Sequence, residues 1–333
     1  MRGTALALAA VALLGAGLGA GCGGDGGNDD EPPMAWSDAP VVPRLTGETR
    51  TQFLADVAAA DARGRNPDVF AKVGDSNTEQ PQNLYGFGCR PVEYGRYGAL
   101  APVVERYKAT PLPGATPPGC GPSNSFTRLS VSARSGSQTM FPVTRIGDDL
   151  RTAGRAVTAC SREEAPVDCE IRVINPRYTI VLTGSNDILL DARWLGIEPG
   201  SEANERTAAI VERIRRDGSV PVLSNLPPAW IPGSTDVDEW GGVLESNANI
   251  QAMADELNVP LINLWRGLEE APVVNRGLAD DGIHLSAYPN GGSTDVFANT
   301  VVLTEAGLRY GANRRNLIWL QTLAALDRVA AGG

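Results

Sequence analysis

Histidine is almost absent from this sequence of 333 residues, which contains a single one, His284. The five cysteines include no Cys-x-x-Cys pair. Structural zinc sites usually take four ligands from cysteine and histidine at short spacings, so this composition argues against a zinc site. It also means that any reaction needing an imidazole base must use His284.

The sequence has neither an excess of basic residues nor an apolar run long enough to cross a bilayer. It has 39 acidic and 29 basic residues, and a net charge of −10. An acidic chain without a basic stripe is not expected to bind nucleic acid or to dock electrostatically on anionic lipid head groups. The apolar run of residues 5–18 is shorter than the roughly 20 residues that a spanning helix needs.

The N-terminus is typical of an export signal. Met1 and Arg2 precede the apolar run, which ends in residues 18–22, LGAGC. This ending resembles a bacterial lipobox, in which the cysteine is acylated and becomes the mature N-terminus. Gly19 departs from the small aliphatic residue preferred there, so cleavage nearby with ordinary secretion, or a retained apolar tail, are the alternatives. We expect residues 1–22 to be a lipoprotein signal peptide and Cys22 to be lipidated, which anchors the exported protein in the cell envelope, periplasmic or at the cell surface.

Residues 23–47 are rich in Gly, Asp and Pro and show no apolar period, so a flexible tether is expected. The cysteines that remain after Cys22 are even in number, which suits two disulfides in an oxidising compartment. Of the three possible connectivities, we favour pairing between sequence neighbours. The expected pairs are Cys89–Cys120 and Cys160–Cys169.

Beyond residue 47, short apolar runs alternate with amphipathic stretches, a pattern typical of a parallel sheet covered by helices on both faces. We predict one α/β domain over residues 48–333, with loop insertions at about 79–125 and 286–302. The predicted strands are Val69–Val73, Leu129–Ala133, Tyr178–Leu182, Val220–Ser224 and Leu261–Leu264. The predicted helices are Thr51–Ala62, Gly95–Lys108, Glu202–Arg216, Val243–Leu257 and Thr304–Ala330.

Two polar motifs carry a candidate nucleophile and base. Ser76 follows the first predicted strand, at the carboxyl end where open α/β sheets bind ligands. His284 follows Asp281 by three residues, with Gly282 between them. An Asp at this spacing can hold one ring nitrogen and so fix the tautomer that leaves the other nitrogen free to act as a base.

Two further motifs offer hydrogen-bond donors for an oxyanion. Asn186, in the segment TGSND that follows the third predicted strand, can project a side-chain amide. Gly136, in Ser-Gly-Ser after the second, can offer its backbone N–H. Acyl transfer requires such donors where the tetrahedral oxyanion develops. A helix cap and a simple turn are the respective alternatives.

Together these motifs resemble the SGNH (GDSL-type) hydrolase family over residues 68–325. The matching blocks are Gly74-Asp75-Ser76, Gly136, Gly184-x-Asn186-Asp187 and Asp281-x-x-His284. Asn77 stands where the family often has Leu or Ile, and no Asn precedes Gly136. The resemblance implies a flavodoxin-like three-layer sandwich, whose five parallel strands in the order 2-1-3-4-5 carry helices on both faces. It also implies an oxyanion hole formed by the N–H groups of Ser76 and Gly136 and the side chain of Asn186.

We therefore expect a serine ester hydrolase that cleaves carboxylic or O-acetyl esters through an acyl-Ser76 intermediate, with Asp281 and His284 completing the triad. No metal or organic cofactor is implied. A thioesterase, or a non-catalytic surface lipoprotein that binds ligands on the same fold, are the alternatives. The substrate is expected to be a small-molecule or glycan ester. Trp230 and Trp240 can either stack on a sugar ring or anchor a long loop.

Overall fold

The protein contains one parallel sheet between two layers of helices. The computed structural model describes residues 36–148, 159–190, 201–229 and 242–332. In this part of the chain, the sheet has four strands in the order β1-β2-β3-β4, and each neighbouring pair is parallel. The strands are β1 (Asn66–Gly74), β2 (Pro176–Leu182), β3 (Val220–Ser224) and β4 (Leu261–Ile262).

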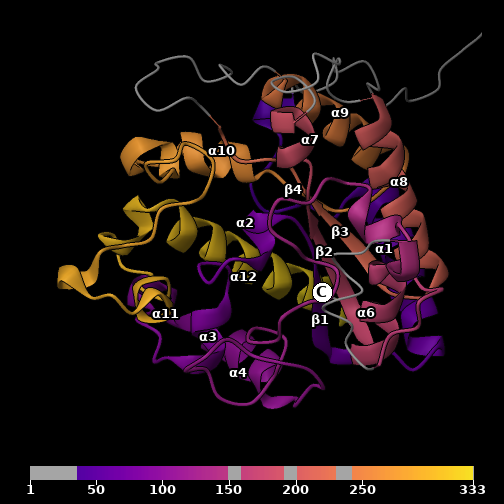
Figure 1. Cartoon of the computed structure of the whole chain (residues 1–333), viewed down its shortest axis with the longest axis horizontal. Coiled ribbons are helices and arrows are strands. Elements are labelled where there is room, and N and C mark those ends of the chain that lie inside the picture. The colour runs from indigo at the N-terminus through magenta and orange to yellow at the C-terminus, as the bar shows by residue number, and fades with distance from the viewer. Residues whose placement is uncertain (1–35, 149–158, 191–200, 230–241, 333) are drawn as a thin grey trace, which may run out of the picture. The chain divides into compact units, whose positions relative to one another are not determined.

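Helices connect and cover these strands (Figure 1). The α-helices are α1 (Gly47–Ala62), α2 (Ser76–Glu79), α3 (Tyr85–Cys89), α4 (Ala101–Ala109), α6 (Pro166–Ile174), α7 (Ser185–Leu190), α8 (Ser201–Arg216), α9 (Val243–Glu256), α10 (Leu264–Glu269), α11 (Val296–Asn299) and α12 (Gly311–Ala330). The 3-10 helices are η1 (Trp36–Asp38), η2 (Gly95–Leu100), η3 (Phe141–Val143), η4 (Ile146–Asp148), η6 (Val274–Gly277), η7 (Asn290–Gly292) and η8 (Gly307–Arg309). None of the helices in the described ranges is long and apolar enough to cross a membrane.

The strands are apolar along their length because helices cover both faces of the sheet. Phe70 of β1 and Tyr178 of β2 face α4 and α1, where they meet Tyr107 and Phe53. On the other face, α6 and α8 contact β1 and β3. Complete burial of a side chain such as Phe70 stabilises the fold by about 1.5–3 kcal/mol relative to exposure. The sheet is therefore a firm support for the loops at its carboxyl edge.

The prediction of a fifth strand at residues 129–133 is wrong. This segment forms a single parallel bridge, from Ala133 to Gly74, on the free edge of β1. Serine hydroxyls replace the backbone ladder along the rest of that edge. Ser125 Oγ accepts the N–H of Phe70 at 3.1 Å, and Ser130 Oγ donates to the carbonyl of Lys72 at 2.6 Å. Because these side chains satisfy the edge of β1, the segment runs beside it without forming a strand.

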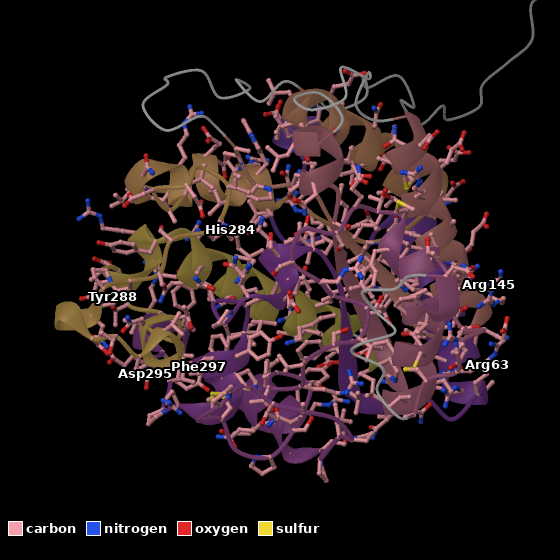
Figure 2. All side chains as sticks on the ribbon, in the orientation of Figure 1. Arg63, Arg145, His284, Tyr288, Asp295 and Phe297 are labelled. Atoms are coloured by element: carbon pink, nitrogen blue, oxygen red, sulfur yellow. A yellow bond between two sulfur atoms is a disulfide. The ribbon has the colours of Figure 1, made fainter. Side chains whose placement is uncertain are left out.

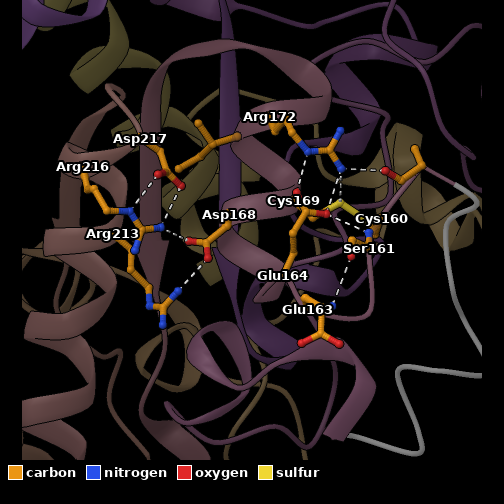
Figure 3. Close-up of polar contacts among 12 residues, drawn as sticks. Cys160, Ser161, Glu163, Glu164, Asp168, Cys169, Arg172, Arg213, Arg216 and Asp217 are labelled. Carbon is orange, nitrogen blue, oxygen red and sulfur yellow. Dashed lines mark hydrogen bonds and ion pairs between the residues drawn. A yellow bond between two sulfur atoms is a disulfide. The ribbon is translucent and has the colours of Figure 1, made fainter.

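Both expected disulfides are present, Cys89–Cys120 and Cys160–Cys169. The second joins the start of α6 to the segment before it, beside a group of ion pairs (Figure 3). In this group, Arg213 and Arg216 of α8 bind Asp168 of α6 at 2.6 and 2.8 Å. Ion pairs near the surface usually contribute about 0.2–1 kcal/mol each, so this group mainly sets how α6 lies against α8.

Part of the predicted tether packs against the domain. Asn263 donates from Nδ2 to the carbonyl oxygens of Trp36 and Ala39 at 2.8 and 3.0 Å. The Trp36 ring meets Trp265 of α10 edge-on, with 5.0 Å between ring centroids. Leu45 is buried. Residues 36–46 therefore form a strap over the end of β4, while Cys22 and the rest of the predicted tether lie outside the described residues.

Candidate active site

Ser76 lies at the sharp turn between the end of β1 and the short helix α2. The turn requires a glycine at position 74, because a Cβ there would lie 2.0 Å from the carbonyl oxygen of Leu182. Asp75 is the N-cap of α2, and its Oδ1 accepts the N–H of Asn77 at 2.9 Å. The turn therefore places Ser76 in the first position of the helix, with its side chain largely buried.

A loop from the far end of the chain brings a base to this serine. His284 Nε2 lies 2.9 Å from Ser76 Oγ, and His284 Nδ1 lies 2.6 Å from Asp281 Oδ2. The other carboxylate oxygen of Asp281 accepts the N–H groups of Ile283 and His284 at 3.0 and 2.9 Å. Gly282 has a φ of 72°, which a residue without Cβ adopts at little cost. The structure thus joins Ser76, His284 and Asp281 in one chain of hydrogen bonds.

Electrostatics set the direction of these hydrogen bonds. Partial burial raises the pKa of the Asp281 carboxyl, but hydrogen bonds from the His284 ring and from two backbone amides outweigh this effect. The pKa of Asp281 therefore lies below its usual value, and the ionised carboxylate can only accept hydrogen bonds. His284 Nδ1 therefore carries a proton toward Asp281, and in the neutral ring Nε2 is the acceptor that faces the Ser76 hydroxyl.

The segment that contains Gly136 lies between α2 and α7. Glu79 of α2 accepts the N–H of Ser135 at 2.5 Å, and Asn186 of α7 donates from Nδ2 to the carbonyl of Ser137 at 3.0 Å. Within the described ranges, the N–H groups of Ser76 and Gly136 have no hydrogen-bond acceptor. Asn186 keeps one amide hydrogen beyond the one given to Ser137. No hydrogen bond among the described residues joins Gly136 or Asn186 to Ser76 itself.

Asp187 holds the same segment in place. Its carboxylate is almost fully buried and accepts both the N–H and the hydroxyl of Thr139, at 2.9 and 2.6 Å. Asn186 and Asp187 thus form hydrogen bonds with neighbouring positions of one loop, but only Asn186 has a further N–H that can donate. Thr139 was not predicted from the sequence, because no local pattern pairs it with an Asp 48 residues away.

The described residues contain no group of three or more His, Cys, Asp and Glu side chains that could hold a metal ion. Trp230 and Trp240, which the sequence offered as possible sugar-stacking rings, lie outside the described residues. In Figure 2, Tyr288, Asp295 and Phe297 of the segment that follows His284 lie to the lower left of it. That segment packs on α3, where Asp295 binds Arg90 at 2.7 Å.

Comparison with known families supplies the context for this geometry. The model of the GDSL-like lipase/acylhydrolase family matches residues 73–288, which is more than half of the chain. The chain belongs to this family. The matched region includes the turn of Ser76 and the loop of Asp281 and His284. A search of curated proteins finds no match.

A search of solved structures finds several that are similar to this GDSL-like protein. A GDSL-like lipase from Bacteroides thetaiotaomicron is 15% identical, with 58% of this chain and 74% of that chain covered and a TM-score of 0.36. Axe2, an acetylxylan esterase from Geobacillus stearothermophilus, is 15% identical, with 76% and 93% covered and a TM-score of 0.42. A lipase/acylhydrolase from Enterococcus faecalis is 14% identical, with 78% and 95% covered and a TM-score of 0.39.

A polar face on the last helix of this GDSL-like protein was not predicted from the sequence. Asn313, Arg315 and Asn316 of α12 are all fully or almost fully buried. Asn313 donates from Nδ2 to the carbonyl oxygens of Asn299 and Val302 at 2.8 and 3.1 Å. The available signal was the run Asn-Arg-Arg-Asn at the start of an otherwise apolar helix. Such a run predicts polar contacts, but it does not say with which part of the chain.

A small apolar pocket adjoins the residues just described. It has a volume of about 10 Å³, which is room for one water-sized group. Its lining includes Ser185 and Ile283, the residues that precede Asn186 and His284. The remaining lining residues are Ile188, Leu189, Leu226, Pro227, Pro228, Ala229 and Val243. This apolar lining therefore lies next to the residues that carry the candidate donor and base.

Proposed function

We propose that this GDSL-like protein is a serine ester hydrolase. The observation that carries the proposal is the continuous chain of hydrogen bonds from Asp281 through His284 to Ser76. A serine hydroxyl is a weak nucleophile unless an adjacent base accepts its proton, and the neutral Nε2 of His284 is such a base. Asp281 orients the ring and stabilises the imidazolium that forms. The family of lipases and acylhydrolases is consistent with this chemistry.

The proposed reaction has two steps. Ser76 Oγ attacks the ester carbonyl carbon while its proton passes to His284 Nε2. The tetrahedral intermediate collapses, the proton passes from His284 to the departing alcohol, and an acyl-Ser76 ester remains. Water then attacks this ester as its proton passes to His284, and collapse releases the acid and restores the Ser76 hydroxyl. The oxyanion formed in each step is stabilised by the N–H groups of Ser76 and Gly136 and by Asn186.

The test of the proposed function is hydrolysis of p-nitrophenyl acetate by the purified protein, compared with the Ser76→Ala variant. Acetylated glycans and a matched thioester, assayed in parallel, define the substrate class. Saturable hydrolysis that depends on Ser76 supports the proposal. Equal rates for the wild type and Ser76→Ala, at a rate above the buffer blank, would overturn it. No turnover of any of these substrates, together with specific ligand binding, would favour the non-catalytic alternative.

Asn186→Ala should lower kcat by about 10²–10³-fold with little change in KM. The reason is that a donor to the oxyanion interacts most strongly in the transition state. Asp187→Ala is the matched control, because Asp187 is adjacent and polar but its carboxylate accepts hydrogen bonds from Thr139 and lies 3.9 Å from Arg206 Nη1. Its loss should lower the melting temperature. Steady-state kinetics and melting curves of both variants test this prediction. If Asn186→Ala is fully active, or loses activity only because it unfolds, then Asn186 has a structural role and does not stabilise the oxyanion.

We also propose that the protein is exported and anchored through a lipid on Cys22. The motif at residues 18–22 supports this, and it lies outside the described residues. Cys22→Ser should move the protein from the membrane fraction to the soluble fraction, because each buried CH₂ of an acyl chain contributes about 0.8 kcal/mol to membrane binding. Fractionation and intact-mass measurement check this. An unchanged distribution between fractions would exclude anchoring at this residue.

A further inference from the structure

The helix that carries Ser76 is a single turn, so other elements must hold it. A nucleus of one turn is unfavourable in isolation, because few hydrogen bonds offset the cost of fixing the backbone. Thr78 donates from Oγ1 to the carbonyl of Leu182 at 3.0 Å, and Asn83 donates to the carbonyl of Thr78 at 2.8 Å. The carbonyl of Asn77, next to Ser76, is held from α12.

Arg315 makes that contact from a fully enclosed position. Arg315 is only 1% exposed, and its Nη1 donates to the carbonyl oxygen of Asn77 at 2.6 Å. Asn316 lies beside it and binds the carbonyl oxygens of Gln82 and Thr300 at 3.0 and 3.1 Å. The start of α12 is therefore fixed against the segments around the nucleophile turn. A guanidinium placed here has a defined position rather than a range of rotamers.

Arg315 and Asp75, the N-cap of the same turn, are both buried, and the pKa of each departs from its usual value. Burial lowers the pKa of Arg315 to about 9, and the attraction of Asp75 opposes that effect. Burial raises the pKa of Asp75 to about 6, and the hydrogen bond from the Asn77 amide to Oδ1 opposes that rise. The defined contact between α12 and this turn is the hydrogen bond from Arg315 Nη1 to the Asn77 carbonyl.

We propose that Arg315 is a positioning residue for the nucleophile, since its buried guanidinium fixes the carbonyl of Asn77, the residue next to Ser76. Ser76 lies between Asn77 and the N-cap Asp75, so the direction of its Oγ and of its free N–H depends on how this turn is held. The inference rests on the proposed ester-hydrolase function. It assigns to α12 a part in catalysis that involves no contact with substrate.

The test compares Arg315→Met and Arg315→Lys with Arg314→Met in the full-length protein. Arg314 is the matched control, because it is half-buried on the same helix and its Nε donates to a carbonyl too, that of Gly267 at 3.1 Å. Arg315→Met should lower kcat for p-nitrophenyl acetate by about 10- to 100-fold with KM nearly unchanged, because small displacements of a reacting group are costly. Arg314→Met should keep the wild-type kcat.

The split between kcat and KM separates positioning from a general loss of stability. Loss of folded protein lowers the melting temperature and the number of active molecules together, whereas misplacement of Ser76 lowers kcat in protein that stays folded. Arg315→Lys keeps a charged donor at this position, so it should restore part of the kcat that Arg315→Met loses. Arg314→Met leaves the contact between Arg315 and Asn77 unchanged.

Several outcomes would overturn the inference. One is a wild-type kcat in Arg315→Met. Another is a fall in kcat for both Arg315 variants that matches the unfolded fraction measured by melting. If Arg315→Met does not fold, Arg315→Lys decides by its kcat relative to Arg314→Met. Failure of the underlying function would look different, because Ser76→Ala would then be as active as the wild type.

Discussion

Ser76→Ala should lower kcat for ester hydrolysis by about 10⁴-fold or more while the protein stays folded. Alanine removes the atom that forms the covalent bond, and no other hydroxyl lies within hydrogen-bonding distance of His284 Nε2 among the described residues. The side chain is largely buried but small, and it is not part of the apolar core. A melting temperature close to that of the wild type is therefore expected alongside the loss of turnover.

His284→Ala should cause a loss of similar size, and the double variant should be little worse than either single variant. Residues that act as one unit in a reaction give strongly non-additive effects. The measurement is steady-state kinetics on the three proteins with p-nitrophenyl acetate. Multiplicative losses would mean that Ser76 and His284 act independently. Full activity in Ser76→Ala would end the account of this protein as a serine hydrolase.

Asp281→Asn should lower kcat by up to about 10⁴-fold, as loss of the orienting carboxylate does in serine proteases with this triad. An amide in this position can present an N–H to His284 Nδ1, which favours the tautomer with its proton on Nε2. That tautomer cannot accept the proton of Ser76. Kinetics with melting curves check this prediction. A loss smaller than tenfold in a folded variant would show that His284 is oriented by other contacts.

The same carboxylate should affect stability in a predictable direction. The folded-state pKa of Asp281 is lowered, since the stabilising hydrogen bonds outweigh the effect of burial. Its contribution to stability is therefore fully present above the unfolded-state pKa and is lost as the pH falls through the folded-state pKa. Melting curves of Asp281→Asn should lack this acid-dependent part. A difference between variant and wild type that does not change with pH would contradict the assignment.

The strands of the core could be predicted because they are continuous apolar runs that end in polar turns. The structure has strands at all four such runs, and Val220–Ser224 has the predicted bounds. The prediction of a fifth strand was wrong for a reason that an apolar pattern does not show. Ser125 and Ser130 satisfy the edge of β1 with their side chains, and this depends on how the segment folds beside it.

The candidate site shows a similar division. The sequence could identify Ser76, Asp281 and His284 because they lie in short motifs, each with a glycine in the turn (Gly74 and Gly282). Arg315 is different, because its contact with Asn77 joins residues 238 positions apart. Nothing in the sequence near either residue indicates the other. Long-range polar contacts of this kind depend on the packing of α12 beneath the turn, which the motifs do not determine.

The central claim is that Ser76 carries the acyl group, and covalent trapping tests it most directly. The purified protein is treated with a fluorophosphonate, digested and analysed by mass spectrometry while residual activity is followed. The account predicts one phosphonyl group per chain, on the peptide and residue of Ser76, with activity lost in proportion to labelling. It also predicts no labelling in His284→Ala on the same timescale. Complete labelling at another residue, or full activity after complete labelling of Ser76, would contradict the account.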